Sequence, residues 1–310
     1  MARRSGLARP RALGPGALVG VCAPAGPLLG PEALDQGLAW FEAQGWRVRC
    51  AAHLRERRGY LAGDDEQRLG DLLALLRDPE VAAIVALRGG YGITRILRHL
   101  EPGELVAARK LFVGYSDTTA LALLLRRAGL SSIHGPMLDR DDVPDAARER
   151  LAALLCGAPA ALEPLHGKPL APGRARGPLV GGNLRMLCAS LGTPWEVDTR
   201  GVILFLEEVG EQPYAIDRSL GQLRDAGKLQ DVAGVAVGQL VNCRSERYPE
   251  TSPCDVIRDV LLPEIDGPVV SGLPFGHLGD NRALGVGVLA ELDGDAATVA
   301  LLEQVVEDGA

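Results

Sequence analysis

The chain has 310 residues, of which 47% are hydrophobic and 24% charged, a composition typical of a globular protein long enough for two domains. Its formal net charge of -7 argues against general binding to nucleic acid or to an anionic membrane, and the 4% aromatic content argues against platforms on which bases stack. The sequence holds no apolar run of about 18 residues, so we expect no membrane span.

The six cysteines are scattered along the chain, with neither a C-x-x-C pair nor a compact zinc spacing. A chain of this size does not need disulfides to hold its core. We therefore expect most of the thiols to be buried, in a reducing compartment, the cytoplasm, and we expect no metal site.

Residues 1–16 carry several arginines ahead of an apolar stretch, a pattern that superficially resembles a secretory signal. Gly14, Pro15 and Gly16 would break the apolar core of such a signal. We instead interpret residues 17–22 as a first buried strand and residues 1–16 as a disordered basic extension.

Residues 17–160 alternate between short apolar runs and helical patterns. The expected strands are 17–22, 46–50, 81–87 and 110–113, and the expected helices are 32–44, 65–77, 93–100, 120–125 and 145–155. This alternation predicts a parallel sheet with helices on both faces, in which ligands bind at the carboxyl ends of the strands.

Two consecutive strands end in unusual loops. The strand 81–87 runs into Arg88-Gly89-Gly90-Tyr91-Gly92, a loop that matches no nucleotide-binding fingerprint but whose glycines allow backbone amides to approach a ligand. The absence of the dinucleotide fingerprint also disfavours a nicotinamide enzyme.

The second loop, Val113-Gly114-Tyr115-Ser116-Asp117, lies between a strand and a helix, where a serine hydroxyl can project beside free helix amides. Ser116 is therefore a candidate nucleophile. The alternative is that Ser116 or Asp117 simply caps the following helix.

The second half begins after residues 161–178, which are rich in proline and glycine and which we interpret as a connection between a domain 17–160 and a domain 179–310. A buried strand at 201–206 ends in Glu207 and Glu208, and a strand at 268–273 leads into a glycine turn that contains His277. Alternate residues of a strand face opposite ways, so only one of the two glutamates can face a site, and the spacing alone does not say which. Serine, histidine and a carboxylate are the groups that serine hydrolysis requires.

Five segments, taken in order, resemble the LD-carboxypeptidase family of serine peptidases, which includes murein tetrapeptide carboxypeptidases and microcin C immunity peptidases. They are RGGYG at Arg88, VGYSD at Val113, GGNL at Gly181, LFLEEVGEQPYAIDRSLGQL at Leu204 and GLPFGHLGDN at Gly272. The resemblance runs from about residue 18 to about residue 302. It implies an α/β protein with an N-terminal parallel-sheet domain of the flavodoxin or Rossmann type and a C-terminal β-rich α/β domain.

The resemblance assigns the nucleophile to Ser116, the acid to Glu207 and the base to His277, and it implies an oxyanion hole made by amides of Asp117 and of the Gly89-Gly90 loop. It implies a homodimer that needs no cofactor and acts on a small peptide, removing the terminal D-alanine of a murein tetrapeptide. Two alternatives remain: the same chemistry on a peptidyl- or aminoacyl-nucleotide, and a non-catalytic module that binds a peptide or anion in its cleft.

Overall fold

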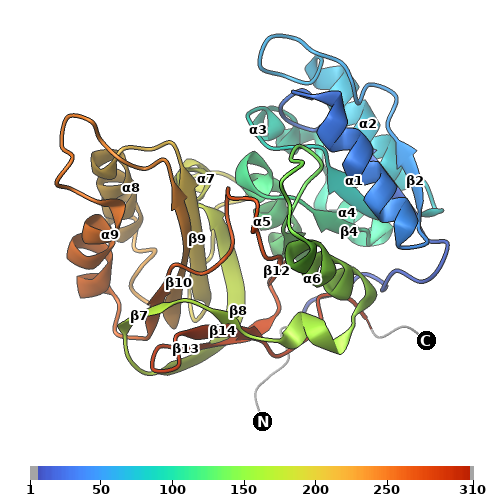
Figure 1. Ribbon diagram of the computed structural model, residues 1–310. Helices are drawn as coiled ribbons and strands as arrows, with labels where there is room; N and C mark the ends of the chain where they lie inside the picture. The colour runs from blue at the N-terminus through green and yellow to red at the C-terminus, as the bar shows by residue number, and fades with distance from the viewer. Residues whose placement is uncertain (1–5, 308–310) are drawn as a thin grey trace.

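The computed structural model describes residues 6–307 and consists of two α/β units, each built on its own sheet. Figure 1 shows the N-terminal unit, coloured blue to green, beside the C-terminal unit, coloured yellow to red. The architecture confirms the expected fold class of an N-terminal parallel-sheet domain and a C-terminal β-rich α/β domain. Within residues 6–307, no helix is both long and apolar enough to cross a membrane.

The N-terminal sheet has the strand order β12-β5-β4-β3-β1-β2, in which β1 to β5 are parallel and β12 is antiparallel. The order 2-1-3-4-5 is that of flavodoxin-like folds, where ligands bind at the switch point between β1 and β3. The strands are β1 (Leu18–Cys22), β2 (Arg47–Cys50), β3 (Val81–Ala86), β4 (Leu111–Val113), β5 (Ser132–His134) and β12 (Leu284–Val286).

Five helices of this unit lie at predicted positions, although α3 is shorter than the predicted 93–100, and α4 was not predicted. They are α1 (Pro31–Ala43), α2 (Asp65–Arg77), α3 (Ile93–Ile96), α4 (Pro102–Ala108), α5 (Thr119–Arg127) and α6 (Asp145–Cys156). Asp64 and Gln67 form a capping box that fixes the start of α2. Residues 119–125 of α5 are all buried, because this helix packs against β5 of its own unit and against β8 and α7 of the other.

The C-terminal sheet has the order β6-β14-β13-β8-β9-β10-β11-β7, with β8 to β11 parallel and the outer strands antiparallel. The strands are β6 (Leu165–His166), β7 (Lys168–Ala171), β8 (Arg174–Asn183), β9 (Ile203–Val209), β10 (Gly234–Val241), β11 (Val269–Ser271), β13 (Leu289–Asp293) and β14 (Thr298–Leu301). The helices are α7 (Leu184–Ser190), α8 (Pro213–Asp225) and α9 (Pro253–Val256).

The stretch 161–178 differs from the expected connection, because it contains β6, β7 and the start of β8. Both β6 and β7 lie at the edges of the sheet. Proline and glycine are tolerated at an edge, where half of the backbone groups need no partner in the sheet. Pro169 lies within β7, and for this reason the stretch shows little strand signal.

Two further segments cross the expected boundaries. The prediction of a disordered extension is wrong for residues 6–16: the amide of Ala8 donates to the carbonyl of Gly129, that of Leu13 donates to Leu155, and the Leu13 side chain is buried. Residues 1–5 lie outside the described chain. Strand β12, near the other end of the sequence, joins the N-terminal sheet by pairing with β5. The C-terminal part of the chain therefore contributes one strand to the sheet of the N-terminal unit.

Candidate active site

Ser116 occupies a strained turn at the exit of β4. Its φ is +63°, in the left-handed region that residues other than glycine rarely adopt and that is frequent at functional sites. Neither Ser116 nor Asp117 caps the helix that follows. Asp117 Oδ2 instead accepts the amide of Ile93 at 2.9 Å, which ties the serine turn to the loop after β3. The capping interpretation of this turn is therefore wrong.

Gly89 lies directly against the serine. A Cβ at this position would stand 2.7 Å from Ser116 Cβ, 2.9 Å from Ser116 Oγ and 3.3 Å from the amide nitrogen of Asp117, so only glycine fits. The amide of Gly26 donates to the Gly89 carbonyl at 2.8 Å and anchors this loop to the exit of β1. Gly90 has a φ of +93°. The absence of a side chain at Gly89 thus lets its backbone approach the serine hydroxyl closely.

Glu207 and His277 form a direct pair in the C-terminal unit. Nδ1 of His277 donates to Glu207 Oε2 at 2.6 Å, and the Glu207 side chain is completely buried. Its other oxygen, Oε1, is buried without a hydrogen-bond partner. The pair fixes Nδ1 as the protonated nitrogen and leaves Nε2 as the basic one.

Glu208 points to the other face of β9. It accepts hydrogen bonds from Asn183 Nδ2 at 2.9 Å, the Arg185 amide at 2.9 Å and the Val209 amide at 2.8 Å. The first two contacts secure the start of α7. The two adjacent glutamates therefore have different environments, and the one beside His277 is Glu207.

The loop that carries His277 is held at both ends by polar side chains. Gln239 accepts the amide of Leu278 at 2.7 Å and donates to the carbonyl of Asp280 at 2.9 Å, while Asn281 accepts the amide of Gly276 at 3.0 Å. Gln239 reaches this loop because β10 bulges opposite Glu207, placing two residues against one in the register with β9. A bulge of this kind is common beside active sites.

The two halves of the site meet through Tyr115. Its ring lies 4.9 Å from the His277 ring, centroid to centroid, in an edge-to-face arrangement. From the N-terminal unit, Arg140 Nη1 also donates to the His277 carbonyl at 3.1 Å. Within the described chain, no hydrogen bond joins the Ser116 hydroxyl to His277. Such bonds are often long in free enzymes and tighten when substrate binds.

Burial shapes the electrostatics of this cluster. Desolvation raises the pKa of Asp117 to about 6, although the Ile93 amide opposes the shift. Burial also raises the pKa values of Tyr115 and Asp139. His134, packed among aromatic rings beneath the base, has its pKa lowered to about 3 by desolvation and then by the charge of His277, so it is neutral.

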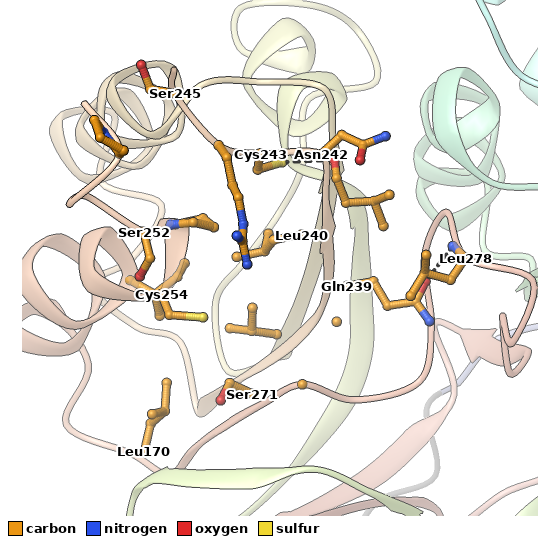
Figure 2. Close-up of a pocket in the computed structure, with 18 of the residues that line it drawn as sticks. Leu170, Gln239, Leu240, Asn242, Cys243, Ser245, Ser252, Cys254, Ser271 and Leu278 are labelled. Carbon is orange, nitrogen blue, oxygen red and sulfur yellow. Dashed lines mark hydrogen bonds between the residues drawn. The ribbon is translucent and has the colours of Figure 1, made fainter. Parts of the chain in front are cut away.

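A cavity of about 870 Å³ opens beside the His277 loop, between β10, α9 and the loop 242–252. Figure 2 shows Gln239 and Leu278 side by side at one end of this cavity, joined by their hydrogen bond, with Ser252 and Cys254 at the opposite end. Its lining is mainly apolar, with a few polar groups, as is usual for the binding site of a small ligand. Among residues 6–307, no three His, Cys, Asp or Glu side chains gather as metal ligands.

The sequence names Ser116, Gly89, Gly90, Asp117, Glu207 and His277 as candidates. The structure places the first four in the loops after β3 and β4 and pairs His277 with Glu207, and the contact between the Tyr115 and His277 rings joins the two groups. Sequence analysis did not identify Gln239, a polar residue near the end of an apolar strand. It also missed Arg140, which lies in a stretch of mixed charge that has no periodic pattern.

The fold is a two-domain α/β architecture in which the serine turn and the pair of His277 and Glu207 belong to different sheets. Comparison with known proteins identifies the family of the chain. The LD-carboxypeptidase N-terminal domain matches residues 19–135, and the LD-carboxypeptidase C-terminal domain matches residues 176–292.

Among individual proteins, the chain is 37% identical over 311 residues to a probable murein peptide carboxypeptidase of Bacillus subtilis, covering 97% of this chain and 96% of the relative. The crystal structure of a muramoyltetrapeptide carboxypeptidase from Oxalobacter formigenes superimposes with a TM-score of 0.80 at 30% identity, covering 92% and 97%. The microcin C7 self-immunity protein of Escherichia coli shares the fold, with a TM-score of 0.86 at 20% identity and coverage of 96% and 99%. The chain belongs to the LD-carboxypeptidase family, and it is a hydrolase of peptide bonds.

Proposed function

We propose that this protein is a serine LD-carboxypeptidase that releases the terminal D-alanine of murein tetrapeptides. In this proposal Ser116 is the nucleophile, His277 the general base and Glu207 the acid that orients it. The observation that carries the proposal is the meeting of two preorganised parts. A strained serine lies against Gly89, and its neighbour Tyr115 packs on a histidine already paired with a buried glutamate.

The reaction proceeds in two halves. Nε2 of His277 takes the hydroxyl proton of Ser116 as Oγ attacks the carbonyl carbon of the scissile bond, and the oxyanion is stabilised by amides of Asp117 and of the Gly89-Gly90 loop. His277 then gives its proton to the departing amine, the C–N bond breaks, and D-alanine leaves an acyl-enzyme. Water, deprotonated by His277, attacks the ester, and the proton returns to Ser116 Oγ as the C–O bond breaks.

The cavity beside the His277 loop gives the body of the peptide a place to lie. It begins at Gln239 and Leu278, next to the base, and its volume of about 870 Å³ falls in the range of small-molecule sites. A peptide whose scissile bond reaches Ser116 can extend its amino-terminal part along this cavity. Two of the relatives are named as carboxypeptidases of murein peptides, one of them of the murein tetrapeptide.

The test is mass spectrometry of a tetrapeptide bearing diaminopimelate and terminal D-alanine, incubated with the wild type or with Ser116→Ala. We expect loss of one alanine with the wild type and a kcat lower by about 10⁴-fold or more in the variant. Covalent labelling of Ser116 by a serine-directed phosphonate serves as an independent readout. A near-wild-type rate in Ser116→Ala would end the triad proposal.

No loss of alanine from the tetrapeptide, together with labelled Ser116, would instead favour an aminoacyl-nucleotide conjugate as substrate. Solved complexes of the microcin C7 self-immunity protein hold aspartyl sulfamoyl adenosine and glutamyl sulfamoyl guanosine. Their similarity to this chain is one of fold. We therefore rank the murein peptide first.

The resemblance to the family also carries a proposed cytoplasmic location and a proposed homodimer. Sedimentation of the purified protein tests the dimer, and fractionation of cells tests the compartment.

A further inference from the structure

Arg88 lies at the switch point of the N-terminal sheet, one residue before the glycine that contacts the nucleophile. It follows β3, and its side chain reaches over the exit of β1, where Nη1 is 3.3 Å from the Pro27 carbonyl. The same nitrogen would lie 3.5 Å from a Cβ on Gly26. The guanidinium therefore occupies the position in which folds of this order bind their ligands.

The guanidinium has unused hydrogen-bonding capacity. Arg88 Nε is buried without a hydrogen-bond partner, and Asp139 Oδ2 lies 3.8 Å away, an ion pair too long for a hydrogen bond. Asp139 Oδ1 is likewise buried and unpartnered. Of five N–H donors, only one makes a bond to the described residues, and that bond is long. Unsatisfied polar groups of this kind call for a ligand or water.

The neighbouring Arg140 provides a contrast. Its Nε donates to Asp142 at 2.7 Å, its Nη2 pairs with the same carboxylate, and its Nη1 donates to the His277 carbonyl at 3.1 Å. Every guanidinium nitrogen of Arg140 thus donates to a group of the protein. Arg88, whose side chain is 19% exposed, keeps donors available, and it precedes Gly89, the glycine that contacts Ser116.

A carboxypeptidase must distinguish a free terminal carboxylate from an internal peptide bond. The carboxylate loses water when it enters the site, so a cation with several fixed donors must compensate, and arginine does this better than lysine. From these contacts we propose that Arg88 binds the terminal α-carboxylate of the substrate, with Asp139 as the positioning residue that orients the guanidinium. The inference rests on the proposed function of Ser116. It adds that Arg88 is the residue that restricts cleavage to the carboxyl end of the peptide.

The test compares two substrates, the tetrapeptide with a free D-alanine carboxylate and the same peptide ending in D-alaninamide. The wild type is expected to prefer the free acid. In Arg88→Gln, kcat/KM for the acid should fall by about 100-fold, mainly through KM, because a charged partner is lost. The kcat/KM for the amide should change by less than about 3-fold, so the preference collapses. Arg88→Lys, which keeps the charge and loses the fork of donors, should recover part of the preference.

Two matched arginine variants serve as controls. Arg140→Gln should slow both substrates by the same factor, since it acts through the His277 loop, and should keep the preference. Arg77→Gln removes an exposed pair with Glu104 and should leave both rates unchanged. Thermal melting shows whether each variant is folded.

The outcomes separate this inference from the proposed function. An unchanged acid-to-amide preference in folded Arg88→Gln, or an equal loss on both substrates, overturns the role of Arg88 and leaves the serine mechanism standing. Absence of cleavage by the wild type, with no labelling of Ser116, overturns the proposed function and the inference together.

Discussion

The two sheets contribute to the site by different physical means. The N-terminal unit holds its part with backbone: Ser116 sits at a φ of +63°, and Gly89 packs against it where a Cβ would not fit. The C-terminal unit holds its part with side chains: Glu207 orients His277, and Gln239 fixes the loop that carries it. The nucleophile is therefore sensitive to changes of shape, and the base to changes of hydrogen bonding.

Glu207→Gln tests the part of the site that the C-terminal unit holds with side chains, and it should have the largest effect. An amide at this position can donate to Nδ1 of His277 and so favour the tautomer whose Nε2 carries the proton, which removes the base. We expect kcat to fall by about 10³- to 10⁴-fold while the protein stays folded. Steady-state kinetics with the tetrapeptide and a thermal melt measure the two effects.

Glu208→Gln is the matched control, one residue along the same strand. Its carboxylate accepts three hydrogen bonds, two of which come from the start of α7, so we expect a loss of about 1–3 kcal/mol in the free energy of unfolding. Its kcat should stay within about 10-fold of the wild type. The assignment of Glu207 would be wrong if Glu208→Gln lost more activity than Glu207→Gln.

The backbone half is tested by Gly89→Ala. The added methyl group would lie 2.7 Å from Ser116 Cβ, so the loop or the serine turn must move. We expect kcat to fall by about 100-fold, the effect of losing one oxyanion donor, with a smaller change in KM. Gly70→Ala in α2 is the control, because nothing lies within 4 Å of its added Cβ. That variant should keep full activity and gain about 0.5–1 kcal/mol of stability. Equal kinetics in the two variants would remove Gly89 from the site.

The sequence predicted the backbone half more fully than the side-chain half. Apolar strands at 81–87 and 110–113 both end in glycine-containing loops, and parallel strands bring their carboxyl ends to one edge, so Gly89 and Ser116 had to be neighbours. Periodicity along a strand also shows that only one of Glu207 and Glu208 can face a site, and the family resemblance then favours Glu207. These inferences need only local pattern and one rule of topology.

Other features depend on partners that are distant in the chain. The bulge at Gly238 and Gln239 exists only through its register with β9, so a pattern of alternating residues cannot reveal it. The pairing of β12 with β5 joins residues about 150 positions apart. Edge strands such as β7 carry proline and little periodicity, which made the stretch 161–178 look like a connection.

The smallest expected effect is a pH-dependent change in stability caused by Asp117, whose carboxylate accepts the Ile93 amide in the N-terminal unit. Burial raises its pKa from 3.8 to about 6, so its ionised form is less stable in the folded protein than in the unfolded chain. Well below pH 3.8 the group is neutral in both states and does not change the free energy of unfolding. As pH rises from about 4 to about 6, the folded state loses up to about 3 kcal/mol because of this group, and the loss stays constant at higher pH. Asp117→Asn removes the titration and keeps an oxygen that can accept the Ile93 amide.

The measurement is urea unfolding of the wild type and Asp117→Asn at pH 4, 5, 6 and 7. The difference between the two free energies of unfolding should shift in favour of the variant by about 2–3 kcal/mol over that range, mostly between pH 4 and 6. A difference that stays flat would show that the amides of Ile93 and its neighbours stabilise the carboxylate as well as water does. The loop that presents Gly89 would then be held at no cost in stability, and the strain of the nucleophile half would reside in the Ser116 backbone alone.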